Sequence, residues 1–167
     1  LRGEHYGGSD AHDWTTNSGR YYLREISVPD GYLIEQRVIP VEFTYENQFI
    51  AWQVVDCLHS DKQTTVEIDK RAFTSDSDDT FALPGATLTV TDWNGNVVDS
   101  WESSDTAHVI CGLHLSHDFA GNRDTSKVYT LAETCPADGY TTARSIQFRL
   151  EQATDDNAYL QETAVWV

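Results

Sequence analysis

The sequence contains no methionine, three cysteines and only three lysines in its 167 residues. Because three is an odd number, Cys57, Cys111 and Cys135 do not make a disulfide framework. They also lack the Cys-x-x-Cys or paired Cys/His spacing of a structural zinc site. The scarcity of lysine means that any reaction requiring an amine nucleophile has few side-chain candidates: Lys62, Lys70 and Lys127.

Positive charge and long apolar runs are also scarce. The 11 Lys and Arg residues stand against 27 Asp and Glu residues, which gives a formal net charge of −16. Because phosphate binding needs clustered Lys and Arg, we expect neither nucleic acid nor an anionic membrane surface as a partner. No apolar run approaches the roughly 18 residues that a membrane-spanning helix requires.

Metal ligands and catalytic triads do not stand out either. The acidic run that contains Asp76, Asp78 and Asp79 lacks the spacing of an EF-hand, so we interpret it as a solvated loop. His114 and His117 share a second polar loop without further ligand residues. We therefore predict no metal, no other cofactor and no hydrolase site.

The residues that are present favour strands. Hydrophobic residues make up 40% of the chain, enough for a packed core, and they alternate with polar residues in many short segments. Turn signals separate these segments, among them Asn94-Gly95, a strong hairpin signal. The pattern predicts an all-β sandwich. Strands are expected at residues 21–25, 38–45, 48–56, 65–73, 86–91, 97–102, 107–111, 128–133, 146–150 and 160–167.

Two of these strands carry a glutamate among apolar neighbours. Glu25 and Glu133 are each followed by a Pro-containing turn and a Gly-Tyr pair, whose Tyr comes seven residues after the Glu. A shift of 108 residues superposes the two stretches, and the long polar loops 1–20 and 114–126 match in position. The chain is therefore interpreted as two tandem copies of one unit.

The repeat predicts the domain organisation. Residues 1–57 are the C-terminal half of a first copy, residues 58–64 are a linker, and residues 65–167 are a nearly complete second copy. A half-sandwich exposes its inner face. We therefore expect this face to be covered by another chain, a swapped strand or a further part of the native protein.

Lys70 continues the apolar face of its strand, after Val66 and Ile68. One interpretation is an exposed lysine that protects a strand edge from aggregation. The other is a buried, reactive lysine. Glu133 presents a similar choice between a solvated or surface-paired carboxylate and a functional one.

A family resemblance bears on that choice. The chain contains, in order, Val66-Glu67-Ile68-Asp69-Lys70, Leu83-Pro84-Gly85-Ala86-Thr87-Leu88, Val109-Ile110-Cys111-Gly112-Leu113 and Tyr129-Thr130-Leu131-Ala132-Glu133, with Pro136 and Gly139-Tyr140 following. This combination resembles the Cna protein B-type (SpaA-like) domains of Gram-positive surface adhesins and pilins, and the resemblance covers nearly the whole chain. It implies an Ig-like, prealbumin-like β-sandwich.

The resemblance also implies a covalent lock. In many such domains a lysine on the first strand attacks an Asn or Asp on the last strand, assisted by a glutamate, to form an isopeptide bond. Lys70 matches the lysine and Glu133 the assisting acid of the second copy, whose acceptor is expected just after Val167. Glu25 and Asp56 match the assisting acid and the acceptor of the first copy, whose lysine strand is not in the sequence. Because the reaction happens once, the protein is not expected to be an enzyme.

The function implied is that of an extracellular stalk or repeat module, anchored to the cell wall through regions outside this sequence and flanked by neighbouring domains of the same surface protein. One alternative is an adhesive module whose long loops, 3–20 and 114–126, contact a host protein or glycan. Another is strand complementation, in which the open half-copy pairs with a lysine-bearing strand from another chain.

Overall fold

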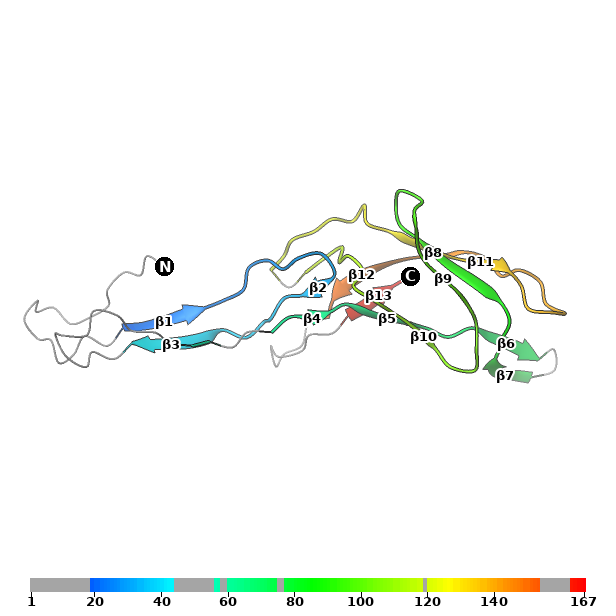
Figure 1. Cartoon of the computed structure of the whole chain (residues 1–167), viewed down its shortest axis with the longest axis horizontal. Helices are drawn as coiled ribbons and strands as arrows, with labels where there is room; N and C mark the ends of the chain where they lie inside the picture. The colour runs from blue at the N-terminus through cyan, green and yellow to red at the C-terminus, as the bar shows by residue number, and fades with distance from the viewer. Residues whose placement is uncertain (1–18, 44–55, 58–59, 75–76, 119, 154–162) are drawn as a thin grey trace, which may run out of the picture.

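The computed structural model describes residues 19–43, 56–57, 60–74, 77–118, 120–153 and 163–167. Within these residues the chain forms 13 β-strands and no helix (Figure 1), so the predicted all-β class is confirmed. The strand expected at 48–56 lies outside the described residues except for Asp56, and the polar loop 1–20 lies outside them except for its last two positions. We call residues 19–43 the first unit and residues 60–167 the second unit.

The strands of the first unit are β1 (Gly19–Leu23), β2 (Tyr32–Leu33) and β3 (Ile39–Phe43). Those of the second unit are β4 (Lys62–Gln63), β5 (Thr65–Ile68), β6 (Arg71–Thr74), β7 (Ser77–Ala82), β8 (Thr87–Thr91), β9 (Val97–Glu102), β10 (His108–Cys111), β11 (Tyr129–Cys135), β12 (Ile146–Gln152) and β13 (Thr163–Trp166).

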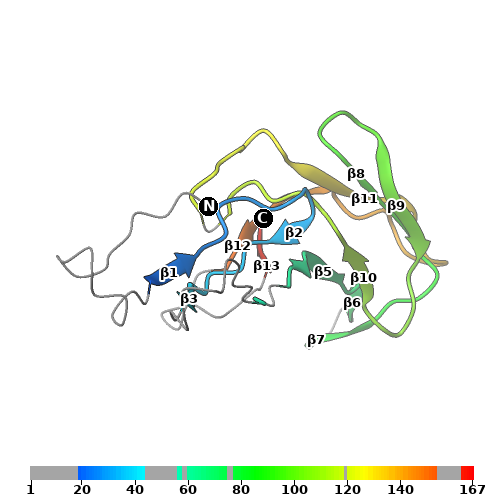
Figure 2. The same cartoon turned by 60° about the vertical axis from the view of Figure 1, so that its left-hand side comes forward.

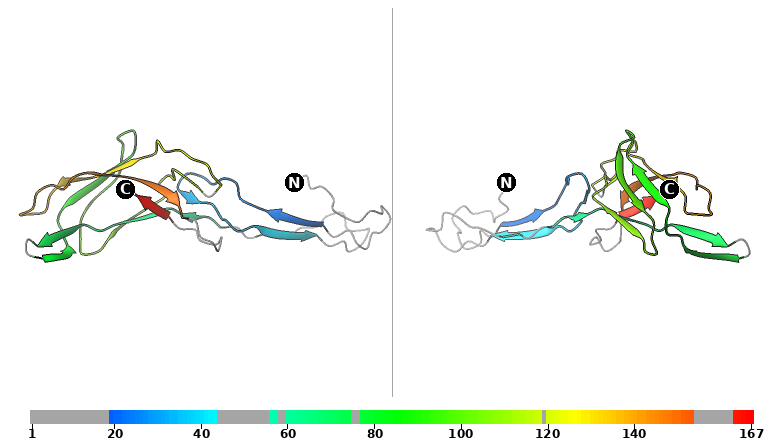
Figure 3. Two further views of the ribbon diagram at one scale, coloured as in Figure 1. Left: turned by 180° about the vertical axis from the view of Figure 1, so that it is seen from behind. Right: turned by 45° about the vertical axis from the view of Figure 1, so that its right-hand side comes forward.

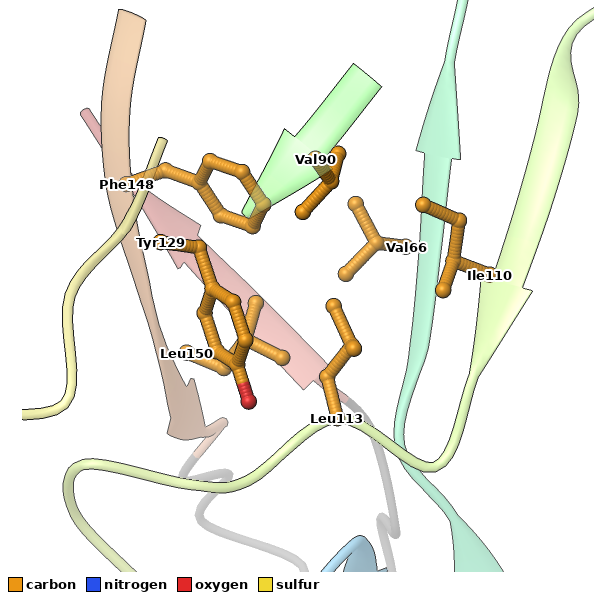
Figure 4. Close-up of a cluster of buried hydrophobic side chains, with 7 residues drawn as sticks. All are labelled: Val66, Val90, Ile110, Leu113, Tyr129, Phe148 and Leu150. Atoms are coloured by element: carbon orange, nitrogen blue, oxygen red, sulfur yellow. The ribbon is translucent and has the colours of Figure 1, made fainter. Parts of the chain in front are cut away.

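The second unit is a two-layered, sandwich-like arrangement. One layer is a five-stranded antiparallel sheet in the order β13-β12-β11-β8-β9, and the other is the antiparallel pair β5–β10. Alternation along each strand directs one set of side chains inward, as in β8, where Leu88 and Val90 are buried between partly exposed threonines. The layers meet in a core, shown in Figure 4, of Val66, Val90, Ile110, Leu113, Tyr129, Phe148 and Leu150.

The chain between β5 and β8 departs from the expectation. The single strand expected at 65–73 is wrong, because the ladder with β10 ends at Ile68 and a new hairpin, β6–β7, begins at Arg71. The solvated acidic loop expected at 74–80 is also wrong in part, since Ser77 begins β7. Arg71 holds this hairpin together by donating to the side-chain oxygen of Thr80 at 2.8 Å and to its carbonyl at 2.9 Å. These bonds across the hairpin, together with the β6–β7 backbone ladder, outweigh the low strand propensity of aspartate.

The Asn94-Gly95 hairpin is confirmed and connects β8 to β9. Gly95 adopts a positive φ of 84°, which the turn requires. The Asp92 carboxylate accepts hydrogen bonds from the side chain of Asn96 and from the backbone N–H groups of Asn94 and Asn96, at 2.8–2.9 Å. These bonds, led by the one from the Asn96 side chain, hold the pKa of Asp92 below its ordinary value.

The first unit projects from one end of the second as a narrow ribbon, which every view in Figures 2 and 3 shows. Its described strands β1 and β3 pair only with each other, in antiparallel register. Tyr22 and Ile26 are 65% and 74% exposed, which agrees with an open apolar face. What covers that face stays a prediction.

Candidate functional site

Lys70 lies where the chain leaves β5 and turns into β6. Its carbonyl accepts a hydrogen bond from the Leu83 N–H at 2.9 Å, which fixes the backbone at this break. Its side chain continues the inward face of β5 after Val66 and Ile68 and is only 15% exposed. The interpretation of Lys70 as an exposed edge lysine is therefore wrong.

Glu133 comes from the opposite layer. It lies on β11, across from Leu88 of β8, and a register shift follows it before Cys135. Its side chain is only 2% exposed, so the interpretation as a solvated or surface carboxylate is wrong. Its oxygen Oε1 lies 3.1 Å from Nζ of Lys70. Its oxygen Oε2 accepts a hydrogen bond from the backbone N–H of Ala143.

This pair is chemically unusual because it is buried. Oε1 of Glu133 is inaccessible to solvent and has no hydrogen-bond partner in the described part of the chain. The Lys70 ammonium is therefore what compensates its charge. The desolvation of two charges offsets much of their attraction, so a buried pair of this kind is a poor device for stability alone.

Glu25 repeats part of this geometry in the first unit. Its Oε2 accepts the N–H of Glu35 at 2.7 Å, ten residues further on, as Glu133 accepts the N–H of Ala143. Each bond spans a turn closed by a glycine of positive φ, Gly31 at 83° and Gly139 at 84°. Glu133 lies within β11, whereas Glu25 lies two residues beyond the end of β1 at Leu23, so the expected strand at 21–25 is wrong at its C-terminal end. Each glutamate thus bonds to the chain just after the turn that follows it, which the sequence did not predict.

The other predicted site residue, Asp56, is exposed. Within the described residues no hydrogen bond or ion pair joins it to Glu25 or Lys70. The structure therefore brings together Lys70 and Glu133 but does not place Asp56 in contact with Glu25. The domain boundaries stay a prediction, although the segment interpreted as a linker, 58–64, contains β4 and ends at a fully buried Thr64.

Sequence reasoning missed a contact between the two units. His114 Nδ1 lies 3.0 Å from Oδ1 of Asp30, and its ring packs edge-on against Trp93 at 5.7 Å. Lys127 lies over the Trp93 ring, with its Nζ 4.1 Å from the ring centroid. Of the two loops proposed for adhesion, 3–20 lies outside the described residues except for its last two positions, and 114–126 lines a surface pocket with residues 27–32 of the first unit. No local sequence pattern indicates such a contact.

The part of the chain that the structure describes contains no cluster of metal ligands and no disulfide. No three His, Cys, Asp or Glu side chains lie together there as a set of metal ligands. The three cysteines, Cys57, Cys111 and Cys135, are unpaired. Among the described residues no helix is long and apolar enough to cross a membrane.

No protein-family model and no curated protein matches this sequence. The resemblance to Cna B-type domains therefore stays a prediction. The structure adds one observation that bears on it: Lys70 and Glu133, which the resemblance matches to the lysine and the assisting acid, form a buried pair.

Proposed function

We propose that this chain is a structural module of an extracellular bacterial surface protein, and that Lys70 and Glu133 serve to lock its second unit with an isopeptide bond. The observation that carries the proposal is the 3.1 Å approach of Lys70 Nζ to Glu133 Oε1, with side chains 15% and 2% exposed. A lysine and a carboxylate so enclosed are placed to exchange a proton rather than to interact with solvent.

The lock also needs an acceptor side chain on a neighbouring strand. The direction in which β13 runs is consistent with an acceptor just beyond its C-terminal end. At one end of the sandwich the N–H of Thr65 donates to the Thr163 hydroxyl at 3.0 Å. β13 is antiparallel to β12, and β12 is antiparallel to β11, so β13 runs toward the end of the sheet that holds Glu133. β5 runs toward the same end, because Lys70 meets Glu133 there.

The spacing along these two strands agrees. Lys70 lies five positions beyond Thr65, and the position that follows Val167 lies five positions beyond Thr163. Because both strands rise about 3.3 Å per residue, a side chain at that position is expected beside Lys70. The final strands of the two copies, 51–56 and 163–167, match at a shift of 112 residues, four more than the shift that superposes Glu25 on Glu133, and this match places the counterpart of Asp56 at the same position.

The chemistry then balances without a cofactor. The Lys70 ammonium gives one proton to Glu133, and the neutral amine attacks the side-chain carbonyl carbon of the acceptor. As the new C–N bond forms, the Lys70 nitrogen loses its second proton to Glu133, which transfers protons to the departing group while its bond to the carbonyl carbon breaks. An Asn acceptor thus releases ammonia and an Asp acceptor releases water. The fixed placement of both groups supplies much of the rate, up to ~7–11 kcal/mol for well-oriented partners.

The experiment adds the acceptor. The chain is extended after Val167 by asparagine and two threonines, and its intact mass is compared with that of a matched extension beginning with leucine. We expect the asparagine version to lose about 17 Da, the mass of one ammonia per bond formed. Peptide mapping should assign the cross-link to Lys70, and the Lys70→Arg and Glu133→Gln variants should keep the full mass. An unchanged mass, with Lys70 still open to amine reagents, would reject the lock.

A further inference from the structure

The two units meet at a buried, hydrogen-bonded joint. The N–H of Thr64 donates to the carbonyl of Gly31 at 2.9 Å, and the N–H of Gly112 donates to the carbonyl of Thr64 at 2.9 Å. The Thr64 hydroxyl donates to the carbonyl of Leu113 at 2.6 Å. Thr64 itself is 0% exposed. One residue thus connects the turn of the first unit to the segment that follows β10.

The approach of the two backbones admits only glycine at position 31. A Cβ atom placed there would lie 2.4 Å from the carbonyl oxygen of Gly112, and backbone atoms cannot move aside as a side chain can. The positive φ of Gly31, 83°, disfavours any other residue as well. The joint is therefore a close fit between two turns.

A glutamine side chain extends the joint. The Gln152 amide accepts the N–H of Ile34 at 3.0 Å and donates to the carbonyl of Ile34 at 2.7 Å, as a neighbouring strand would. Gln36 returns a hydrogen bond to the carbonyl of Ala153 at 3.2 Å. Leu33 and Ile34 are each 1% exposed. Hydrogen bonding and apolar burial therefore coincide here, which makes the interface specific as well as stable.

The second copy of the same turn shows what the joint adds. Gly139 has nearly the same φ, 84°, but a Cβ atom there would meet nothing within 4 Å. The counterparts of Leu33 and Ile34 are Thr141 and Thr142, and both are exposed. Burial is thus a property of the docked turn and not of the turn motif.

We propose that the end of the second unit formed by Thr64, Gly112, Leu113 and Gln152 is a docking socket for the turn of the unit that precedes it. Its partner is a Pro-Asp-Gly-Tyr turn followed by two apolar residues, here Pro29 to Ile34. Docking fixes the angle between the units and holds the described strands β1 and β3, which as an isolated pair would be marginally stable. The proposal does not depend on the isopeptide lock.

The two glycines provide the test in the full chain. Gly31→Ala and Gly139→Ala impose the same strain at positive φ, but only the first meets backbone. The readout is amide hydrogen exchange at Ile34 and Thr64, with small-angle X-ray scattering to follow the separation of the units. We expect Gly31→Ala to raise exchange at both amides about tenfold or more, as local opening of the joint requires, and to broaden the distance distribution. Gly139→Ala should leave both amides at the wild-type rate.

If Gly31→Ala does not fold, a second pair of variants tests the docking socket. Gln152→Ala removes the amide contacts without a clash, whereas Gln147→Ala on the same strand removes an exposed glutamine. Faster exchange at Ile34 in Gln152→Ala alone would support the socket. Equal exchange in the two glutamine variants, or in the two glycine variants when both fold, would overturn it.

Discussion

Replacing Lys70 with methionine tests whether the buried pair is as strongly coupled as its geometry indicates. Methionine keeps a long flexible side chain but removes the cation that faces Glu133. At the observed 3.1 Å, Coulomb's law with an effective dielectric constant of about 20 gives an attraction of about 5 kcal/mol. Removing one partner of a buried pair typically costs about 3–5 kcal/mol, because the other charge is left uncompensated. We therefore expect Lys70→Met to lower the free energy of unfolding by about that amount.

The measurement is urea unfolding of the 167-residue chain, followed by circular dichroism. A neighbouring exposed pair serves as the matched control. Asp69 contacts Arg71 at 2.8 Å, but the two side chains are 38% and 47% exposed. Asp69→Asn should therefore cost only about 0–1 kcal/mol.

A double variant completes the cycle. Lys70→Met combined with Glu133→Gln should be less destabilised than the sum of the single variants, by about 0.5–3 kcal/mol for groups in contact. The reasoning is refuted if Lys70→Met costs no more than Asp69→Asn, or if the two single effects add without coupling.

Two further predictions concern the core. Burial raises the pKa of Tyr129 above its ordinary value of 10.0, helped by the charges of Asp92 and Asp30 and opposed by the hydrogen bond from the His114 N–H. The stabilising contribution of the neutral phenol is then complete below pH 10.0 and is lost as pH rises through the folded-state pKa. The Tyr129→Phe variant should not show that loss of stability at alkaline pH. At neutral pH it should be about 1–3 kcal/mol less stable than wild type, because the His114 N–H loses its acceptor. If denaturant titrations showed the same alkaline decline in unfolding free energy for the variant and the wild type, the prediction would be contradicted. Phe148 is 4% exposed, so Phe148→Ala should lower the free energy of unfolding by about 3–5 kcal/mol. Phe73 is 73% exposed, so Phe73→Ala should lower it little. Similar shifts in melting temperature for the two variants would count against the assignment of Phe148 to the core.

The strands that the sequence predicts well are those with clear alternation. β8 and β12 lie close to their expected bounds, because alternate positions along them are buried on one face. β9 also matches its expected bounds, but none of its side chains is buried, and there the Asn94-Gly95 turn marks where the strand begins. The pairing of Lys70 with Glu133 is what the family resemblance implies; the apolar face before Lys70, taken alone, left an exposed edge lysine as an alternative. By contrast, β2 and β4 have two residues each and cannot show any periodicity.

The joint could not be predicted because its parts are distant in sequence. Gln152 bonds to Ile34 across 118 positions, and a single buried glutamine on a strand has no pattern of its own. The β6–β7 hairpin was missed for a different reason. Its acidic residues indicate a loop, and it is the pairing of β7 with β6, supported by the bonds from Arg71 to Thr80, that makes this segment a strand.

The common direction of β5 and β13 has a mechanical consequence. A pull applied between the start of β5 and the end of β13 acts at opposite ends of the sandwich, along the strands. The hydrogen bonds of β5 to β10 and of β13 to β12 lie across that direction. The load therefore falls on each ladder in shear, with its bonds strained together instead of peeled apart one after another.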